Sequence, residues 1–163
     1  MNKKNRLRRT MMFLNAQKPT LLKDPFIYGP DSLIFDLEDA VAPEEKDAAR
    51  FVLAHALKKV DYHNCEKVVR INGIDTPYWK EDIRCAVFAG CDSIRIPKTE
   101  SAEGVKEVEA EIIKAEQEAG VELGSTLLMA AIESALGVLN LQEICGASPR
   151  LFGVALSAGD YTK

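Results

Sequence analysis

The stretch TLLMAAIE, residues 126–133, is an uninterrupted run of apolar or β-branched residues that stops at one carboxylate, Glu133. A run without polar alternation is typical of a parallel strand that is covered on both faces. The stretch LFGVALSAGD, residues 151–160, has the same character and reaches Asp160 soon after its apolar part. The two stretches predict successive strands of a parallel sheet, each followed by an acid.

Helical patterns separate these stretches from four similar ones nearer the N-terminus. One helix is expected to begin near Pro43, and a later one is expected to follow a cap at Thr99 or Ser101 and to end at Gly120. Helices are expected over residues 76–89 and 135–145, and over the apolar stripes Ala49, Val52, Leu53, Ala56, Leu57 and Val105, Val108, Ile112, Ala115. The expected strands are residues 11–15, 32–37, 68–72, 93–97, 126–132 and 151–156.

Strands and helices therefore alternate with a spacing of about 30 residues, and no linker or low-complexity segment interrupts them. This βα alternation predicts an α/β fold with a parallel sheet, either open and doubly wound or closed as a barrel. A complete (β/α)8 barrel needs about 250 residues, whereas the chain has 163. We therefore expect residues 1–163 to form a single, partial domain.

Composition excludes several classes of function. The chain is 47% hydrophobic and 28% charged, with a net charge of −4, which argues against nucleic acid as the main partner. No apolar run approaches the roughly 20 residues of a membrane span. Four cysteines without CxxC spacing indicate reduced thiols in a cytoplasmic protein. The two histidines, His55 and His63, favour neither a zinc site nor a Ser-His-Asp triad, and no Gly-rich nucleotide motif occurs.

The N-terminus is strongly basic. We interpret it as a solvated arm, with contact to a phosphate or a thioester cofactor as the alternative. The basic residues are Lys3, Lys4, Arg6, Arg8 and Arg9.

Charged and polar residues recur where the expected strands end. Ligand-binding and catalytic groups of α/β folds collect at the carboxyl ends of parallel strands. A charge next to an apolar run is costly to bury unless it is paired or binds an ion, so five successive strand ends with such residues indicate a site. The residues are Asp36, Glu38 and Asp39, then Arg70 and Asn72, then Lys98, Glu133 and Asp160.

Two carboxylates without a nearby His or Cys suit Mg²⁺ or Mn²⁺, so Glu133 and Asp160 are the candidate metal ligands. A helix cap or a salt bridge is the alternative for each acid. Arg70 could pair with Asp36 or Glu38, or its planar fork could bind a substrate carboxylate or a developing enolate oxygen. For Lys98 the alternative is a solvated or structural role, and for Asp39 a helix cap.

Six motifs together resemble the citrate lyase beta subunit family, a branch of a metal-dependent aldolase superfamily that includes malyl-CoA lyases. The resemblance covers nearly the whole chain. Relatives often have Pro-Gly where this chain has Asn15 and Ala16, and Glu where it has Gly159. The motifs are RRTMMFLN, FDLEDAVAPEEKDAAR, VVRING, IRIPKTES, AAIESALGV and GVALSAGDY.

The resemblance implies a (β/α)8 TIM barrel, here truncated to about six βα units. It also implies a Mg²⁺ ion held by Glu133 and Asp160, substrate binding by Arg70, Glu133 and Lys98, and a catalytic role for Arg70 and for Glu38, which supports the water shell of the metal. These four features are expectations from the family and do not follow from residue spacing.

The implied activity is the cleavage of a citryl thioester, carried on an acyl carrier protein, into oxaloacetate and an acetyl thioester. The expected partners are the alpha and gamma (acyl carrier) subunits of citrate lyase and further copies of the chain. Alternatives are a malyl-CoA or methylmalyl-CoA lyase and a truncated, non-catalytic assembly subunit.

Overall fold

Six parallel strands form one sheet in the computed structural model, which describes residues 5–161. Their spatial order is their order along the chain, β1-β2-β3-β4-β5-β6. The predicted strands are confirmed with shifts of one or two residues at most ends. The strands are β1 (Met11–Asn15), β2 (Ser32–Asp36), β3 (Glu66–Arg70), β4 (Ser93–Ile96), β5 (Leu127–Ile132) and β6 (Leu151–Leu156).

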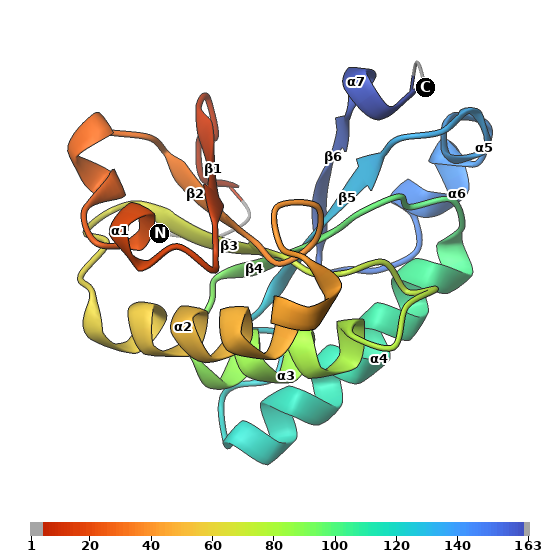
Figure 1. Ribbon diagram of the computed structural model, residues 1–163. Coiled ribbons are helices and arrows are strands. Elements are labelled where there is room, and N and C mark those ends of the chain that lie inside the picture. Colours follow the sequence, from red (N-terminus) through yellow and green to blue (C-terminus); the bar gives the residue numbers. More distant parts are fainter. Residues whose placement is uncertain (1–4, 162–163) are drawn as a thin grey trace.

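This strand order decides between the two predicted architectures. A doubly wound sheet reverses its strand order at one point, so its helices cover both faces. Here every crossover moves to the next strand in the same direction, and crossovers are almost always right-handed, so the connecting helices fall on one face. Figure 1 shows α2, α3 and α4 together on one side of the sheet. The fold is a partial (β/α) barrel with six strands, as expected.

The helices begin and end where local sequence signals place them. The 18-residue α4 begins after Ser101, whose Oγ accepts a hydrogen bond from the Gly104 amide, and ends at Gly120 with φ of 66°. The helices are α1 (Pro19–Leu22), α2 (Lys46–Lys59), α3 (Trp79–Phe88), α4 (Ala102–Ala119), α5 (Ala135–Leu139), α6 (Leu141–Cys145) and α7 (Ala158–Tyr161), with 3-10 turns η2 (Pro25–Tyr28) and η3 (Pro43–Glu45).

The hydrophobic core fills the space between the sheet and the helices. Alternate strand residues such as Phe35, Ile71 and Ile94 point into it and meet the predicted helix stripes, for example Leu53 and Ile112. The residues between them point to the opposite face, which is the inside of the barrel. Polar groups on the strands therefore gather inside the barrel and at its carboxyl rim.

The helix-facing side of β6 is uncovered in the part of the chain that the structure describes. Val154 and Leu156 are paired in register with Ala130 and Ile132, which belong to the buried core. Yet Val154 is 36% exposed and Leu156 is 66% exposed. No described helix packs on these two side chains as α2, α3 and α4 pack on the earlier strands.

Two predictions about local structure are wrong. Residues 135–145 form two short helices instead of one, because the chain leaves helical geometry at Asn140, whose Nδ2 donates to the Glu100 carbonyl. The solvated arm does not describe Arg8, which lies against the barrel with its guanidinium paired to Glu66 at 2.6 Å. Arg9 is exposed but pairs with Asp31; Lys3 and Lys4 lie outside the described residues.

Two compositional expectations can be compared directly with the fold. None of the four cysteines forms a disulfide. Within residues 5–161, no helix is long and apolar enough to cross a membrane.

Candidate active site

A row of polar side chains crosses the inside of the barrel at the level where β1 to β4 end. The parallel register aligns Asn15 with Asp36, Asp36 with Arg70, and Arg70 with Arg95. The next residue in the row is Met129 on β5. Because aligned residues of neighbouring strands point to the same face, the sheet itself brings these groups together.

Arg70 is the most firmly held member of this row. Its Nε and Nη2 each donate to one oxygen of Asp36, both at 2.7 Å, and its Nη1 lies 3.1 Å from Glu38 and 3.4 Å from Asp39. Burial opposes the charge of Arg70, but the hydrogen bonds and charge of Asp36 outweigh it and raise the pKa. The ion-pair alternative for Arg70 is therefore what the structure contains, and Asp39 contacts Arg70 instead of capping a helix.

Glu38 lies between two cations at the rim. One of its oxygens is 2.9 Å from Lys98 Nζ, and the other is 3.1 Å from Arg70 Nη1. Burial raises the pKa of Glu38, and the two cations oppose that effect. The hydrogen bond to Glu38 raises the pKa of Lys98, which is therefore charged.

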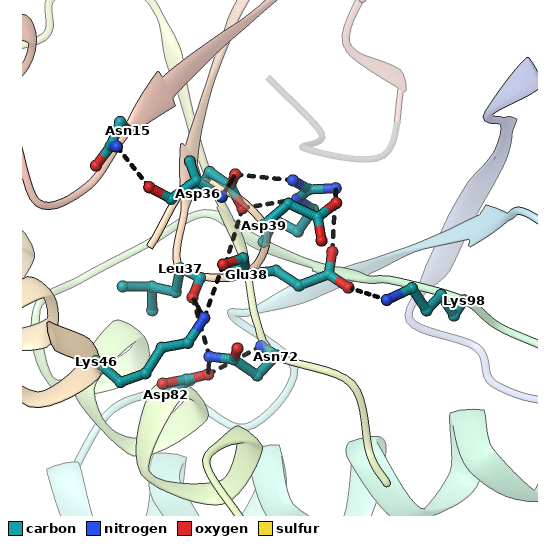
Figure 2. Close-up of polar contacts among 11 residues, drawn as sticks. Asn15, Asp36, Leu37, Glu38, Asp39, Lys46, Asn72, Asp82 and Lys98 are labelled. Carbon is teal, nitrogen blue, oxygen red and sulfur yellow. Dashed lines mark hydrogen bonds and ion pairs between the residues drawn. The ribbon is translucent and has the colours of Figure 1, made fainter. Parts of the chain in front are cut away.

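The Lys98 backbone is in the left-handed region, with φ of 44°. A residue other than glycine costs about 1–3 kcal/mol there and persists only where its surroundings hold it. This geometry directs the Lys98 side chain from the end of β4 toward Glu38, as Figure 2 shows.

Side chains from three other elements fix the acidic loop, residues 36–39. Lys46 at the start of α2 donates to the Leu37 and Glu38 carbonyls, both at 2.7 Å, and Asn15 donates to the Ala40 carbonyl at 2.6 Å (Figure 2). Buried carbonyls need such partners, and a cation makes the stronger bond. Sequence reasoning missed Lys46, since the charged run EEKD reads as a solvated helix start.

Asn72, the other predicted residue at the end of β3, supports the loop from below. Its Nδ2 donates to the Leu37 carbonyl at 3.1 Å and to Asp82 at 2.7 Å. Asp82, on α3, is fully buried and also accepts from the Asn72 amide and from Arg50. Asn72 therefore holds the acidic loop in place and does not face the open rim.

The two candidate metal ligands follow adjacent strands. Glu133 comes directly after β5 and is 6% exposed. Asp160 lies in α7, beyond the end of β6; its side chain lies outside the described residues. The backbone pairing continues past the strands, because the Ser157 amide donates to the Ile132 carbonyl at 2.9 Å. Both acids thus leave the sheet at the carboxyl rim.

The donor set fits a hard divalent cation. Among the described residues no three His, Cys, Asp or Glu side chains gather closely enough to hold a metal by themselves. Mg²⁺ typically takes one or two protein carboxylates and completes its shell with water and substrate oxygens. A buried Glu133 and a second acid from the neighbouring strand end suit this type of site.

A cavity of about 770 Å³ opens at the rim beside these groups. The loops after β2, β3, β4 and β5 line it, and its wall includes Asp39, Gly73, Lys98, Glu133 and Ser134. Both signs of charge face this cavity, as a site for an anionic substrate and a cation requires.

Comparisons with known proteins agree with this geometry. Residues 9–163 match the family described as HpcH/HpaI aldolase/citrate lyase. The chain is 56% identical over 157 residues to citrate lyase subunit beta of Leuconostoc mesenteroides subsp. cremoris, covering 96% of this chain and 52% of that protein. It is 36% identical over 159 residues to L-malyl-CoA/beta-methylmalyl-CoA lyase of Rhodobacter capsulatus, covering 96% and 50%.

Solved structures give the same result. The citrate lyase beta subunit of Mycobacterium tuberculosis, complexed with oxaloacetate and magnesium, superposes with a TM-score of 0.74 at 27% identity, covering 99% of this chain and 62% of that one. The chain spans about half the length of the curated relatives it matches. With a family match over nearly its whole length, the chain belongs to the HpcH/HpaI aldolase/citrate lyase family.

Proposed function

We propose that the polypeptide containing this chain is a Mg²⁺-dependent carbon–carbon lyase that cleaves a citryl thioester to oxaloacetate and an acetyl thioester. The observation that carries the proposal is the rim itself, where an Arg70 fixed by Asp36 shares one edge of the barrel with the buried Glu133. The higher identity to a citrate lyase beta subunit, 56% against 36% for a malyl-CoA lyase, favours the citryl substrate.

In this proposal Glu133 and Asp160 hold the Mg²⁺ ion. The ion supplies Lewis-acid chemistry, which lowers the pKa of the substrate hydroxyl and orients the adjacent carboxylate. Glu133 also contacts substrate, since it lines the cavity together with Lys98. The support is the fit of the donor set and the relative of known structure, which binds magnesium and oxaloacetate.

Arg70 stabilises the negative charge that builds up as the carbon–carbon bond breaks. Asp36 holds two edges of its fork, so the guanidinium does not need to reorganise during the reaction. Its pKa is raised, so it remains charged at any working pH. Loss of one such fixed donor commonly lowers the rate by about 10²–10³.

Glu38 and Lys98 complete the proposed site. Glu38 supports the water shell of the metal, and Lys98 binds the substrate from the exposed side, where 59% of its side chain is accessible. Their mutual ion pair at 2.9 Å fixes both groups before substrate arrives. Arg70 Nη1 contacts the same carboxylate, so the three side chains form one connected unit.

The proposed physiological substrate is carried on an acyl carrier protein, the gamma subunit, and the alpha subunit and further copies of this chain are the proposed partners. The support is that the relatives are named as subunits of citrate lyase. The proposed location is the cytoplasm.

The test uses the complete polypeptide with Glu133→Gln and Asp160→Asn variants. Wild type and variants are incubated with citryl-CoA and, separately, malyl-CoA in Mg²⁺, and oxaloacetate and glyoxylate are measured. We expect Mg²⁺-dependent release of oxaloacetate by the wild type and a loss of at least about 10²-fold in each variant. Glu118→Gln on exposed α4 is the control, expected to leave the rate unchanged.

Three results would contradict the proposal. Glyoxylate without oxaloacetate would establish the malyl-CoA lyase alternative, and no cleavage of either thioester would favour the assembly subunit. Near-normal oxaloacetate release by either acid variant would overturn the metal-ligand assignment alone.

A further inference from the structure

Arg95 is a buried arginine inside the barrel that the proposed mechanism does not yet use. It lies on β4 between Ile94 and Ile96, whose side chains belong to the helix-facing core, so the Arg95 side chain points to the barrel interior. The register places it directly beside Arg70 on one side and Met129 on the other. It is 6% exposed.

No described carboxylate pairs with this guanidinium. Its one hydrogen-bond contact is from Nη1 to the Met129 sulfur at 3.7 Å, a weak acceptor, and its buried Nε has no partner. A buried charge is normally paired, because desolvation is costly otherwise. Burial first, and then the like charge of Arg70, lower the pKa of Arg95, and Glu133 is the acid that opposes them most.

One aromatic ring spans the two arginines. The Phe13 ring centroid on β1 lies 5.1 Å from the Arg70 guanidinium carbon and 5.5 Å from that of Arg95. Cation–π contact stabilises the arginines without occupying their N–H donors. Phe13 is itself 50% exposed, so the ring borders the open interior and is not part of the closed core. The Arg95 donors thus remain available to an anion that enters the barrel.

We propose that Arg95 binds the second carboxylate of the oxo-acid half of the substrate, the group that oxaloacetate has and glyoxylate lacks. The inference rests on the proposed function. A citryl group carries one carboxylate on the carbon that bears the hydroxyl and another one carbon further away, whereas a malyl group has only the first. Arg70 is largely satisfied by Asp36 and Glu38, while Arg95 has no anion of its own. Arg95 therefore determines selectivity for the citryl substrate.

The test compares Arg95→Met, Arg95→Lys and wild type in the complete polypeptide with Mg²⁺. Arg95→Met keeps the volume and removes the charge; Arg95→Lys keeps the charge and removes the fork. The readouts are kcat/KM for citryl-CoA and malyl-CoA, and the binding of freshly dissolved oxaloacetate and pyruvate by calorimetry. Pyruvate is oxaloacetate without the second carboxylate. Arg84→Met, an exposed arginine on α3, is the control.

We expect Arg95→Met to lower kcat/KM for citryl-CoA and the affinity for oxaloacetate by about 10- to 100-fold, as for a lost charged hydrogen bond. The values for malyl-CoA and pyruvate should change by less than about threefold, and Arg95→Lys should fall between wild type and Arg95→Met. The melting temperature of Arg95→Met without ligand should not fall, because an unpaired buried charge has been removed. If Arg95→Met does not fold, the same comparison is made with Arg95→Lys.

Equal losses for both thioesters and for both oxo acids would overturn the inference and make Arg95 a positioning residue for Glu133, with the proposed function intact. Unchanged selectivity in the variants would also overturn it. A wild type that cleaves malyl-CoA but not citryl-CoA would overturn the proposed function and the inference together.

Discussion

Asparagine in place of Asp36 is the most informative perturbation of the rim. Oδ1 of Asp36 accepts from Arg70 Nε at 2.7 Å and the Glu38 amide at 2.9 Å, and Oδ2 accepts from Arg70 Nη2 at 2.7 Å and the Ala40 amide at 3.1 Å. Each oxygen thus faces two donors. Whichever way the asparagine amide turns, its NH₂ group faces two N–H groups and loses both bonds.

The cost follows from these contacts. One lost bond is to a charged group, worth about 1.5–3 kcal/mol, and one is to a backbone amide, worth about 0.5–1.5 kcal/mol. The substitution also removes the main counter-charge of the buried Arg70, although Glu38 remains at 3.1 Å. Breaking a buried ion pair typically costs about 3–5 kcal/mol. We therefore expect the free energy of unfolding to fall by about 3–5 kcal/mol.

The assay is urea unfolding of wild type, Asp36→Asn, Arg70→Met and the double variant. The double variant should be more stable than the sum of the two single losses predicts, because it leaves no buried charge without a partner. Arg84→Met is the matched control: its pair with Glu118 is about half exposed on both sides, so its loss should cost less than about 1 kcal/mol. An Asp36→Asn cost below about 1 kcal/mol, or strict additivity, would refute the reasoning.

Two further predictions concern the acidic loop. Burial raises the pKa of Glu38 above its ordinary value of 4.5, so the folded state binds its proton more tightly than the unfolded state. The stability from Glu38 should therefore be present at low pH and be lost as pH rises through and above 4.5, and unfolding curves of wild type against Glu38→Gln should diverge in that direction; a difference independent of pH would contradict this. Lys46→Met should cost about 2–4 kcal/mol in urea unfolding, because the Leu37 and Glu38 carbonyls lose a charged donor, and should lower lyase activity through a loosened loop; unchanged stability would contradict the role of Lys46.

The strands were predictable because parallel strands are apolar on both faces, so each is a local signal in the sequence. The same holds for α4, whose ends are fixed by Ser101 and Gly120 within a few residues of chain. The break at Asn140 was not predictable in this way. It depends on a hydrogen bond to Glu100, 40 residues away, which only the folded chain creates.

The site was predictable in its residues but not in its pairing. Strand ends identified Arg70, Glu38 and Glu133, since parallel strands bring their carboxyl ends to one edge. The partner of Arg70 is set by the register between β2 and β3, which aligns Asp36 with it. Sequence alone allowed either Asp36 or Glu38, and the register supplies the choice. Arg95 escaped notice because an arginine between two isoleucines reads as one half of an ordinary alternating strand.

The register row also explains how one edge can serve both a cation and a multiply charged anion. On the β2 and β3 side, Asp36 and Glu38 already neutralise Arg70, so that side is built before any ligand binds. On the β4 side, Arg95 has no acid beside it in the row. The β5 end contributes the buried Glu133. A ligand that adds carboxylates near β4 and a cation near β5 would balance both charges at once, whereas either alone would leave the other buried and uncompensated. Under the proposed function, this predicts that oxaloacetate and Mg²⁺ each raise the affinity for the other, which calorimetry with and without the second ligand measures directly.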